Sequence, residues 1–144
     1  MIVVGTSDEK VFLYKIIGEE MKKVGQLQKQ TAASTVSITG HKTKLCVVSK
    51  ASKIEMYSFM DVESVEKKLI KQAKRKAKKV RTAAEMEGEE AEAPKVDKSQ
   101  IKEQVAQGDY DHSTHFSLLC DAEIPHGKVR STVFNDKLLY FGLH

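Results

Sequence analysis

The chain has no tryptophan and few aromatic residues of any kind, which limits the core that it can build. Aromatic residues make up 6% of its 144 residues, whereas 31% are charged. Long apolar runs are also missing, and no segment approaches the ~20 residues that a membrane-spanning helix needs. The N-terminal sequence MIVVGTSDEK has no basic region ahead of an apolar stretch and so does not predict a secretory signal. We therefore expect a small, polar globular chain with no membrane partner.

Cysteine is scarce, and its placement argues against a disulfide framework. Cys46 and Cys120 both lie in apolar runs. This pattern favours two reduced, buried thiols in a cytosolic or nuclear protein. No basic residue is placed beside Cys46 to lower the pKa of its thiol, so it is expected to be a core residue rather than a nucleophile.

Recognisable catalytic motifs are missing as well. The sequence contains no Gly-rich phosphate loop, no nucleophile elbow and no zinc-protease helix motif. One cluster, formed by Asp109, Asp111, His112 and His115 with Cys120 further on, has a spacing at which two histidines could share a metal ion. No second Cys/His pair completes a closed site, and solvated loop residues are the better interpretation. We expect no enzymatic activity, no cofactor and no small-molecule substrate.

What the sequence does contain is an internal repeat. Residues 2–14 line up with residues 45–57 at an offset of 43 residues, so that Tyr14 matches Tyr57. A third copy begins at 139–142, where the offset from the first copy is 137 residues. That offset exceeds two periods by 51 residues, which predicts one insertion between strands of the repeat.

The repeating unit has the pattern of β-structure. Short apolar runs rich in Val, Ile and Tyr are separated by turn residues, with turns expected at Ser7-Asp8-Glu9 and at Gly40-His41. A 43-residue repeat of four short antiparallel strands has the period of a WD-repeat β-propeller blade. A β-sandwich is the alternative, but it would not need the period. The expected strands are 2–6, 10–16, 22–29, 34–39, 44–49, 53–59, 115–121, 128–134 and 137–143.

The frame of the repeat predicts three segments. Residues 1–60 form the first propeller blades, 61–111 form a charged helical and disordered insertion, and 112–144 continue the blades. The first copy opens at the second strand of a blade and the last copy stops after the equivalent strand, which gives about two blades plus part of a third. A closed propeller needs ~4–8 blades. We therefore expect a fragment of a longer protein, or a truncated gene model, with an all-β fold outside the insertion.

The insertion begins with a predicted helix over residues 61–81. Asp61 is suited to cap its start, Glu63 lies in its first turn, and good helix formers dominate the rest of the segment. The apolar residues of this segment form one narrow stripe at spacings of three and four. Acidic residues then predominate, and 85–111 is expected to be largely irregular apart from a helical turn or two within 98–107.

The basic residues of this helix are the candidate functional residues. Nine of the fifteen residues from Lys67 to Arg81 are Lys or Arg. This block predicts a nuclear targeting signal, a contact with RNA phosphates, or both. No aromatic residues are interleaved to stack on bases, so an RNA contact would be sensitive to salt and blind to sequence. The alternative is a solvated helix that keeps a long loop soluble. The candidate residues are Lys67, Lys68, Lys71, Lys74, Arg75, Lys76, Lys78, Lys79 and Arg81.

Three stretches of the sequence resemble one WD-repeat family, that of the U-three small nucleolar RNA-associated WD-repeat protein number twelve, called WD-repeat protein three in animals. The first stretch is the strand pair VVGTSDEKVFLYKI. The second is KIEMYSF, which runs on into the basic helix KKLIKQAKRKAKKVR. The third is the return KVRSTVF followed by KLLYFGLH, after the polar DYDHSTHFSLLCDAEIP. A charged helical insertion at this blade position is more specific than the strand motifs.

The resemblance implies a nucleolar, non-catalytic scaffold of the small-subunit processome. Its partners would be other processome proteins and precursor ribosomal RNA or small nucleolar RNA. The sequence departs from generic repeats at their Trp-Asp dipeptide, where it has Tyr14-Lys15 and Tyr57-Ser58. The second propeller and the helical C-terminal domain of the family have no counterpart in this chain. The alternative function is a WD-repeat protein–protein interaction adaptor in another pathway, such as trafficking or ubiquitin ligation.

Overall fold

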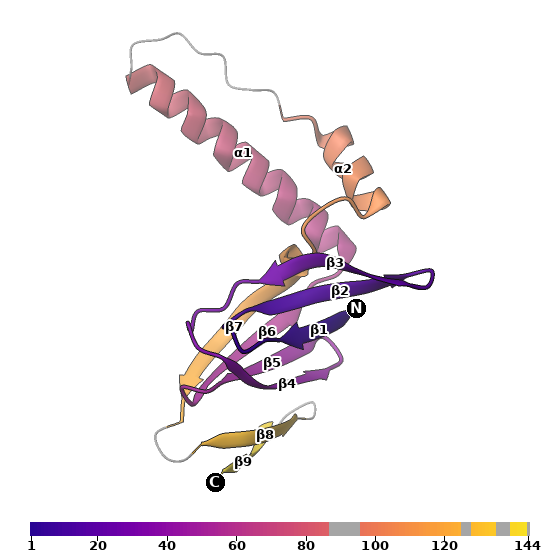
Figure 1. Ribbon diagram of the computed structural model, residues 1–144. Helices are drawn as coiled ribbons and strands as arrows, with labels where there is room; N and C mark the ends of the chain where they lie inside the picture. The colour runs from indigo at the N-terminus through magenta and orange to yellow at the C-terminus, as the bar shows by residue number, and fades with distance from the viewer. Residues whose placement is uncertain (87–95, 125–127, 135–138, 144) are drawn as a thin grey trace. The chain divides into compact units, whose positions relative to one another are not determined.

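The computed structural model describes residues 1–86, 96–124, 128–134 and 139–143. Within these ranges the chain is mostly antiparallel β-sheet, with two α-helices and one short 3-10 helix (Figure 1). The elements in order are β1 (Ile2–Gly5), β2 (Val11–Ile17), β3 (Glu20–Leu27), β4 (Thr35–His41), β5 (Lys44–Ser49), β6 (Lys53–Phe59), α1 (Val62–Met86), α2 (Lys98–Gln107), η1 (His112–His115), β7 (Phe116–Glu123), β8 (Val129–Phe134) and β9 (Leu139–Leu143).

The chain divides into two compact units. One unit, here called the sheet unit, comprises residues 1–60 and 111–144. The other, here called the helical unit, comprises residues 61–110. The helical unit is therefore inserted in sequence between β6 and β7, within one residue of the position where the repeat predicts an insertion.

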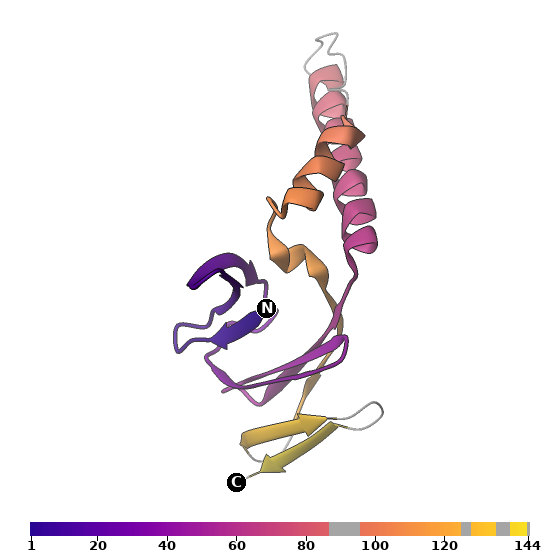
Figure 2. The same cartoon turned by 90° about the vertical axis from the view of Figure 1, so that its right-hand side faces the viewer.

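Strand order in each sheet follows chain order. The sheets are β1-β2-β3, β4-β5-β6-β7 and β8-β9, and every pairing is antiparallel (Figures 1 and 2). All nine strands lie within two residues of the expected bounds. The expected turn at Gly40-His41 is wrong, because both residues belong to β4. The chain instead turns at Lys42, whose φ of 50° lies in the left-handed region.

The strand registers repeat with the period found in the sequence. Ile2 lies opposite Tyr14, and 43 residues further on Leu45 lies opposite Tyr57. The pairing of β2 with β3 shifts register immediately before Tyr14, and the pairing of β6 with β7 shifts immediately before Tyr57. The expected equivalence of the two tyrosines is confirmed in strand register. Because a β-bulge re-aims side chains locally, its recurrence marks a structural repeat and not only similar composition.

The third copy repeats the register too. Thr35 lies opposite Ser49, and Val129 lies opposite Leu143. In both pairs the register shifts directly after the first partner. The offset of 94 residues between the two pairs exceeds one period by the 51 residues that were in excess in the sequence.

Strand β5 lies at the centre of the core and is buried on both faces. Leu45 and Val47 belong to one apolar cluster, which includes Val11, Leu13 and Leu27 from β2 and β3, together with Tyr57 and Phe116. Cys46 and Val48 belong to a second cluster with Ile54 and Val129. Successive side chains of a strand point to opposite faces, so the LCVV run serves two layers at once.

Hydroxyl groups join β4 to β8. Thr39 donates a hydrogen bond from Oγ1 to the carbonyl oxygen of Thr132 over 2.7 Å. The Ser37 and Thr132 hydroxyl oxygens lie 3.0 Å apart. Thr132 is buried, so these bonds satisfy polar groups that water does not reach.

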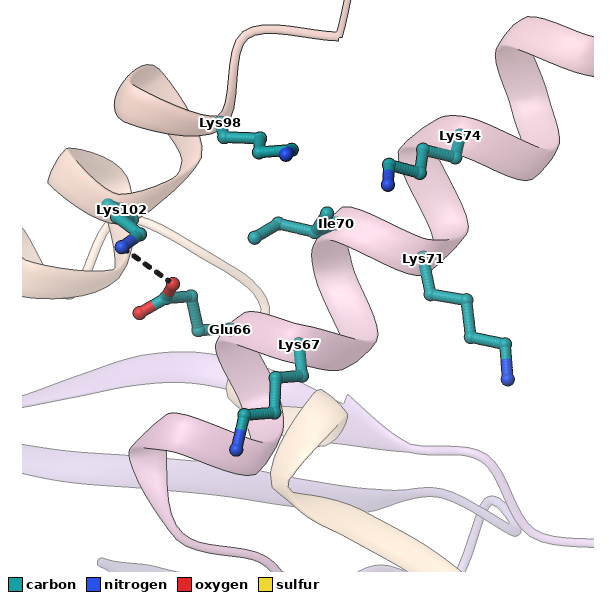
Figure 3. Close-up of a pocket in the computed structure, with 7 residues that line it drawn as sticks. All are labelled: Glu66, Lys67, Ile70, Lys71, Lys74, Lys98 and Lys102. Atoms are coloured by element: carbon teal, nitrogen blue, oxygen red, sulfur yellow. Dashed lines mark ion pairs between the residues drawn. The ribbon is translucent and has the colours of Figure 1, made fainter.

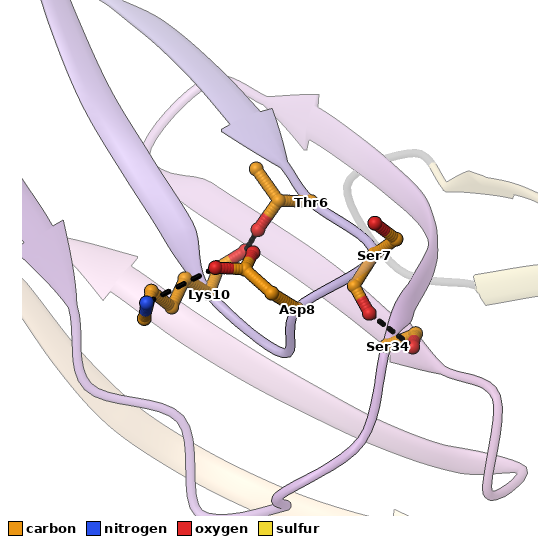
Figure 4. A network of polar contacts seen from close by, with 5 residues as sticks. All are labelled: Thr6, Ser7, Asp8, Lys10 and Ser34. Atoms are coloured by element: carbon orange, nitrogen blue, oxygen red, sulfur yellow. Dashed lines mark hydrogen bonds and ion pairs between the residues drawn. The ribbon is translucent and has the colours of Figure 1, made fainter.

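Short polar contacts close the turn between β1 and β2 (Figure 4). Thr6 donates from its hydroxyl to the carbonyl of Lys10 over 2.9 Å, and Lys10 donates to the carboxylate of Asp8 over 3.0 Å. Contacts with the Thr6 hydroxyl and then the Lys10 ammonium lower the pKa of Asp8. Ser34 donates from Oγ to the carbonyl of Ser7 over 2.7 Å. All are exposed contacts of an ordinary turn and form no nucleophile–base arrangement.

A buried carboxylate holds the connection that leads from β3 to β4. Glu55 on β6 is fully buried and accepts hydrogen bonds from the backbone N–H groups of Gln30 and Thr31, over 3.1 and 2.7 Å. It also accepts a bond from the hydroxyl of Tyr57. Burial raises the pKa of Glu55, but these hydrogen bonds favour the charged form more strongly, so the net shift is downward.

We predict that Glu55→Gln destabilises the sheet unit by about 1–2 kcal/mol, because the bonds that the carboxylate accepts are charge-assisted. A carboxyl whose pKa is lowered on folding contributes stability above its ordinary value of 4.5 and loses it as the pH falls through the folded-state value. Urea unfolding at pH 7 and at pH 3 should therefore show a gap between wild type and variant that shrinks in acid. Glu20→Gln, at an exposed position, serves as the control. An equal gap at both pH values would contradict the assignment.

The ends of β6 and β7 are joined at the point where the helical unit is inserted. Met60 donates its backbone N–H to the carbonyl of His115 over 2.7 Å, and His115 Nδ1 lies 2.8 Å from the Met60 carbonyl oxygen. Asp111 caps η1 through the backbone N–H of Ser113 over 2.9 Å. A Cβ added at Gly25 would lie 2.4 Å from Asp111 Oδ1, so only glycine allows this close approach.

Replacing residues 61–110 by a short Gly-Ser linker should leave the sheet unit folded, because Met60, Asp111 and His115 remain. A shorter closed loop also costs less entropy, so the midpoint of thermal unfolding should stay the same or rise. Far-ultraviolet circular dichroism should lose its helical component and keep its strand component. Loss of cooperative unfolding in the deletion variant would show that the sheets need the insertion.

Candidate nucleic-acid interface

Helix α1 begins as the sequence predicts. Asp61 Oδ1 accepts a hydrogen bond from the backbone N–H of Ser64 over 2.7 Å, which satisfies one of the free donors of the first turn. This bond holds the pKa of the Asp61 carboxyl below its ordinary value. The helix ends at Met86, five residues beyond the expected end at residue 81. Residues 82–86 contain neither Gly nor Pro, so nothing in this stretch breaks the helix.

The apolar stripe of α1 is uneven. Val65 is fully buried, and Leu69 and Ala73 are half-buried, whereas Val62 and Val80 are more than half exposed. Only the middle of the stripe is therefore covered, and the rest of the helix surface meets solvent.

The basic residues of α1 fall on distinct faces. At 3.6 residues per turn, Lys67, Lys71, Lys74 and Lys78 share one face of the helix. Lys68, Arg75 and Lys79 form an adjoining row, and Lys76 lies furthest from the first face. Lys68 is half-buried and the side chain of Arg81 lies outside the described part of the structure; the remaining seven are exposed.

Helix α2 corrects the expectation that 85–111 is largely irregular. Asp97 caps its start by accepting from the backbone N–H groups of Ser99 and Gln100, over 2.8 and 3.3 Å. Gly108, with a φ of 75°, ends it in the left-handed conformation that glycine adopts readily. The helix covers residues 98–107, where the sequence indicated one or two turns. The expectation of disorder for residues 87–95 lies outside the described residues.

A pocket of 430 Å³ lies between α1 and α2 (Figure 3). It is a shallow depression that is largely open to solvent rather than an enclosed cavity. The structure brings together three of the nine candidate residues here and leaves the other six outside the lining. The lining residues are Glu66, Lys67, Ile70, Lys71 and Lys74 from α1 and Lys98 and Lys102 from α2.

Sequence reasoning missed the two lysines of α2. Lys98 and Lys102 are four residues apart and so share a helix face, directly after the capping Asp97. The cap and the spacing were both visible in the sequence. Their placement beside α1, however, depends on packing between two segments that are not adjacent in the chain.

The expectation of solvated loop residues holds for Asp109 and Asp111, which are exposed. It is wrong for His112 and His115, which are both buried. The ring of His115 stacks on Phe59 at 4.8 Å, and the rings of His112 and His115 stack at 5.6 Å. Among the residues that the structure describes, no group of three or more His, Cys, Asp or Glu side chains is placed to hold a metal ion. The histidine rings instead pack against each other and against Phe59, at the end of β6.

The two thiols differ from each other. Cys46 is fully buried, and burial raises the pKa of its thiol to about 11. Cys120 is exposed on β7, so the expectation that both cysteines are buried is wrong for it. Strand β7 is the outer strand of its sheet, and an apolar run there need not be covered.

These exposures predict selective alkylation. At pH 8 iodoacetamide should modify Cys120 in the native protein and leave Cys46 intact, because only the thiolate reacts and Cys46 is buried and protonated. Mass spectrometry should find one adduct on the native chain and two in guanidinium. Cys120→Ser should give no native adduct. Rapid native modification of Cys46 would contradict its placement in the core.

Within the described ranges, neither helix is apolar over enough residues to cross a membrane. Neither a protein-family model nor a curated protein sequence matches the chain.

Proposed function

We propose that this chain is part of a WD-repeat β-propeller that acts as a non-catalytic scaffold in nucleolar assembly of the small ribosomal subunit. Its partners are other proteins of the small-subunit processome and precursor ribosomal RNA or small nucleolar RNA. The observation that carries the proposal is a register repeat of 43 residues, interrupted between two paired strands by a basic helix.

The strand order supports the propeller. The sheet β4–β7 has the four antiparallel strands, in chain order, of a complete blade. Sheet β1–β3 corresponds by register to the last three strands of a preceding blade, and β8–β9 to the first two of the next. A β-sandwich has no need for repeated registers or for bulges at repeated positions, so it is the weaker interpretation.

The charge of α1 supports the RNA contact. Seven of the nine basic side chains are exposed, and like charges this close repel one another unless anions lie between them. The resemblance of the sequence to the processome WD-repeat family supplies the nucleolar setting.

A general adaptor is the second candidate, and one feature of the sheet unit favours it. Ile16 lies opposite Met21 on the β2–β3 hairpin, and both side chains are more than half exposed, as is that of Ile17 to about half. An exposed apolar hairpin suits a protein contact.

Changing Lys74, Arg75, Lys76, Lys78 and Lys79 together to Gln tests the proposal. In tagged full-length protein from cells, we expect weaker nucleolar retention and recovery of crosslinked precursor ribosomal RNA reduced at least severalfold, with a shallower salt dependence. Glutamine is a good helix former, so α1 should persist. If the variant localises and binds RNA like the wild type at every salt concentration, α1 is a solvated spacer. Background RNA from the wild type, with a cytoplasmic location, would favour the adaptor.

A further inference from the structure

The pocket between α1 and α2 concentrates positive charge beyond what the basic run of α1 provides. Five of its seven lining residues are lysines, and three come from α1 and two from α2. Among the described residues that line it, Glu66 supplies the only carboxylate. Formal charge in the pocket is therefore strongly positive, and the two helices contribute to it jointly.

Two of the five lysine side chains converge on the gap between the helices, whereas those of Lys67 and Lys71 are directed away from it (Figure 3). Figure 3 shows Lys98 and Lys74 directed toward each other across the gap between the helices, with Ile70 lying between the two helices below them. Lys102 turns to Glu66, and their charged atoms are 3.6 Å apart. Two ammonium groups that face one gap repel each other. An anion that binds between them relieves this repulsion and is therefore stabilised there.

We propose that this pocket binds phosphate groups of an RNA backbone, with Lys74 and Lys98 as its central contacts. The inference deepens the proposed function and rests on it for the choice of RNA. It adds two lysines of α2 that the basic run of α1 does not include, and it makes the contact a two-helix site rather than a diffuse charged surface.

The shape of the site favours a chain of phosphates over a single phosphate ion. The row from Lys67 to Lys74 rises roughly 10 Å along α1. That length exceeds one phosphate group and suits successive phosphates of a backbone. Among the described residues that line the pocket none is aromatic, so the lining offers bases no stacking platform and binding is independent of sequence.

Glu66 limits the affinity of the pocket. The carboxylate of Glu66 forms an ion pair with Lys102, and it also repels an incoming phosphate. Glu66→Gln should therefore tighten RNA binding by about twofold to fivefold, while the other lining residues remain unchanged. This gain of function is informative because a damaged helix would produce a loss instead.

The decisive comparison uses two double variants that remove equal charge. Lys74→Gln with Lys98→Gln removes the two central contacts of the pocket, and Lys76→Gln with Lys79→Gln changes exposed residues of α1 outside it. Binding of the 144-residue chain to a fluorescein-labelled twelve-nucleotide oligouridylate is measured from 50 to 200 mM salt. Circular dichroism checks that helix content is unchanged, and inorganic phosphate serves as a competitor.

We expect the double variant in the pocket to make the slope of log affinity against log salt less steep by about 1.4. This is about 0.7 for each phosphate that is no longer neutralised. The matched pair should lower it by less than half as much, and inorganic phosphate should compete only at high concentration. Equal reductions from the two pairs would overturn the pocket and leave RNA binding by α1 standing. An unchanged slope in the pocket pair would also overturn it. Absence of binding by wild type at 50 mM would overturn both the pocket and direct RNA contact.

Discussion

The pairing of β6 with β7 is the constraint on which the sheet unit depends. Phe59 and Phe116 lie opposite each other although the whole helical unit separates them in sequence. Closing a flexible loop of that length costs on the order of 3–4 kcal/mol. Seven register pairs along the strands, the two contacts between Met60 and His115, and the stack of Phe59 on His115 offset this cost. Helix formation in the inserted segment lowers this closure cost further, because fewer residues of the loop remain flexible.

Much of the sheet unit was predictable because its signals are local. Alternating apolar runs, turn residues and a fixed period predicted the strands to within two residues, and the 51-residue excess located the insertion. The errors occur where the third dimension decides. The turn after β4 lies at Lys42, which has a positive φ although lysine is not a residue type that predicts one. Cys120 lies in an apolar run but on an outer strand, and His112 and His115 are buried by contacts with distant residues.

Only the part of the candidate site that lies on α1 was predictable from the sequence, and the reason is the same. A run of Lys and Arg is visible in any linear sequence, and helical geometry assigns Lys67, Lys71 and Lys74 to one face. What the sequence does not show is that α2 places Lys98 and Lys102 beside them. Those two residues belong to a ten-residue helix in a polar segment, where the pattern indicated little beyond a turn or two. Packing of the ten-residue, weakly apolar α2 against α1 follows no periodicity that can be read from the sequence.

Charged residues have different roles in the two units of this chain. In the sheet unit the buried charge of Glu55 is stabilised by hydrogen bonds from Gln30, Thr31 and Tyr57, so that it holds a connection in place. In the helical unit the pocket is lined by five lysines and, among the described residues, by one carboxylate, that of Glu66, which pairs with Lys102. A buried charge that accepts hydrogen bonds internally contributes to stability, whereas an excess of exposed charge of one sign favours binding of oppositely charged partners. Substitutions in the first set should therefore change unfolding at fixed salt, and substitutions in the second should change salt-dependent binding at fixed stability.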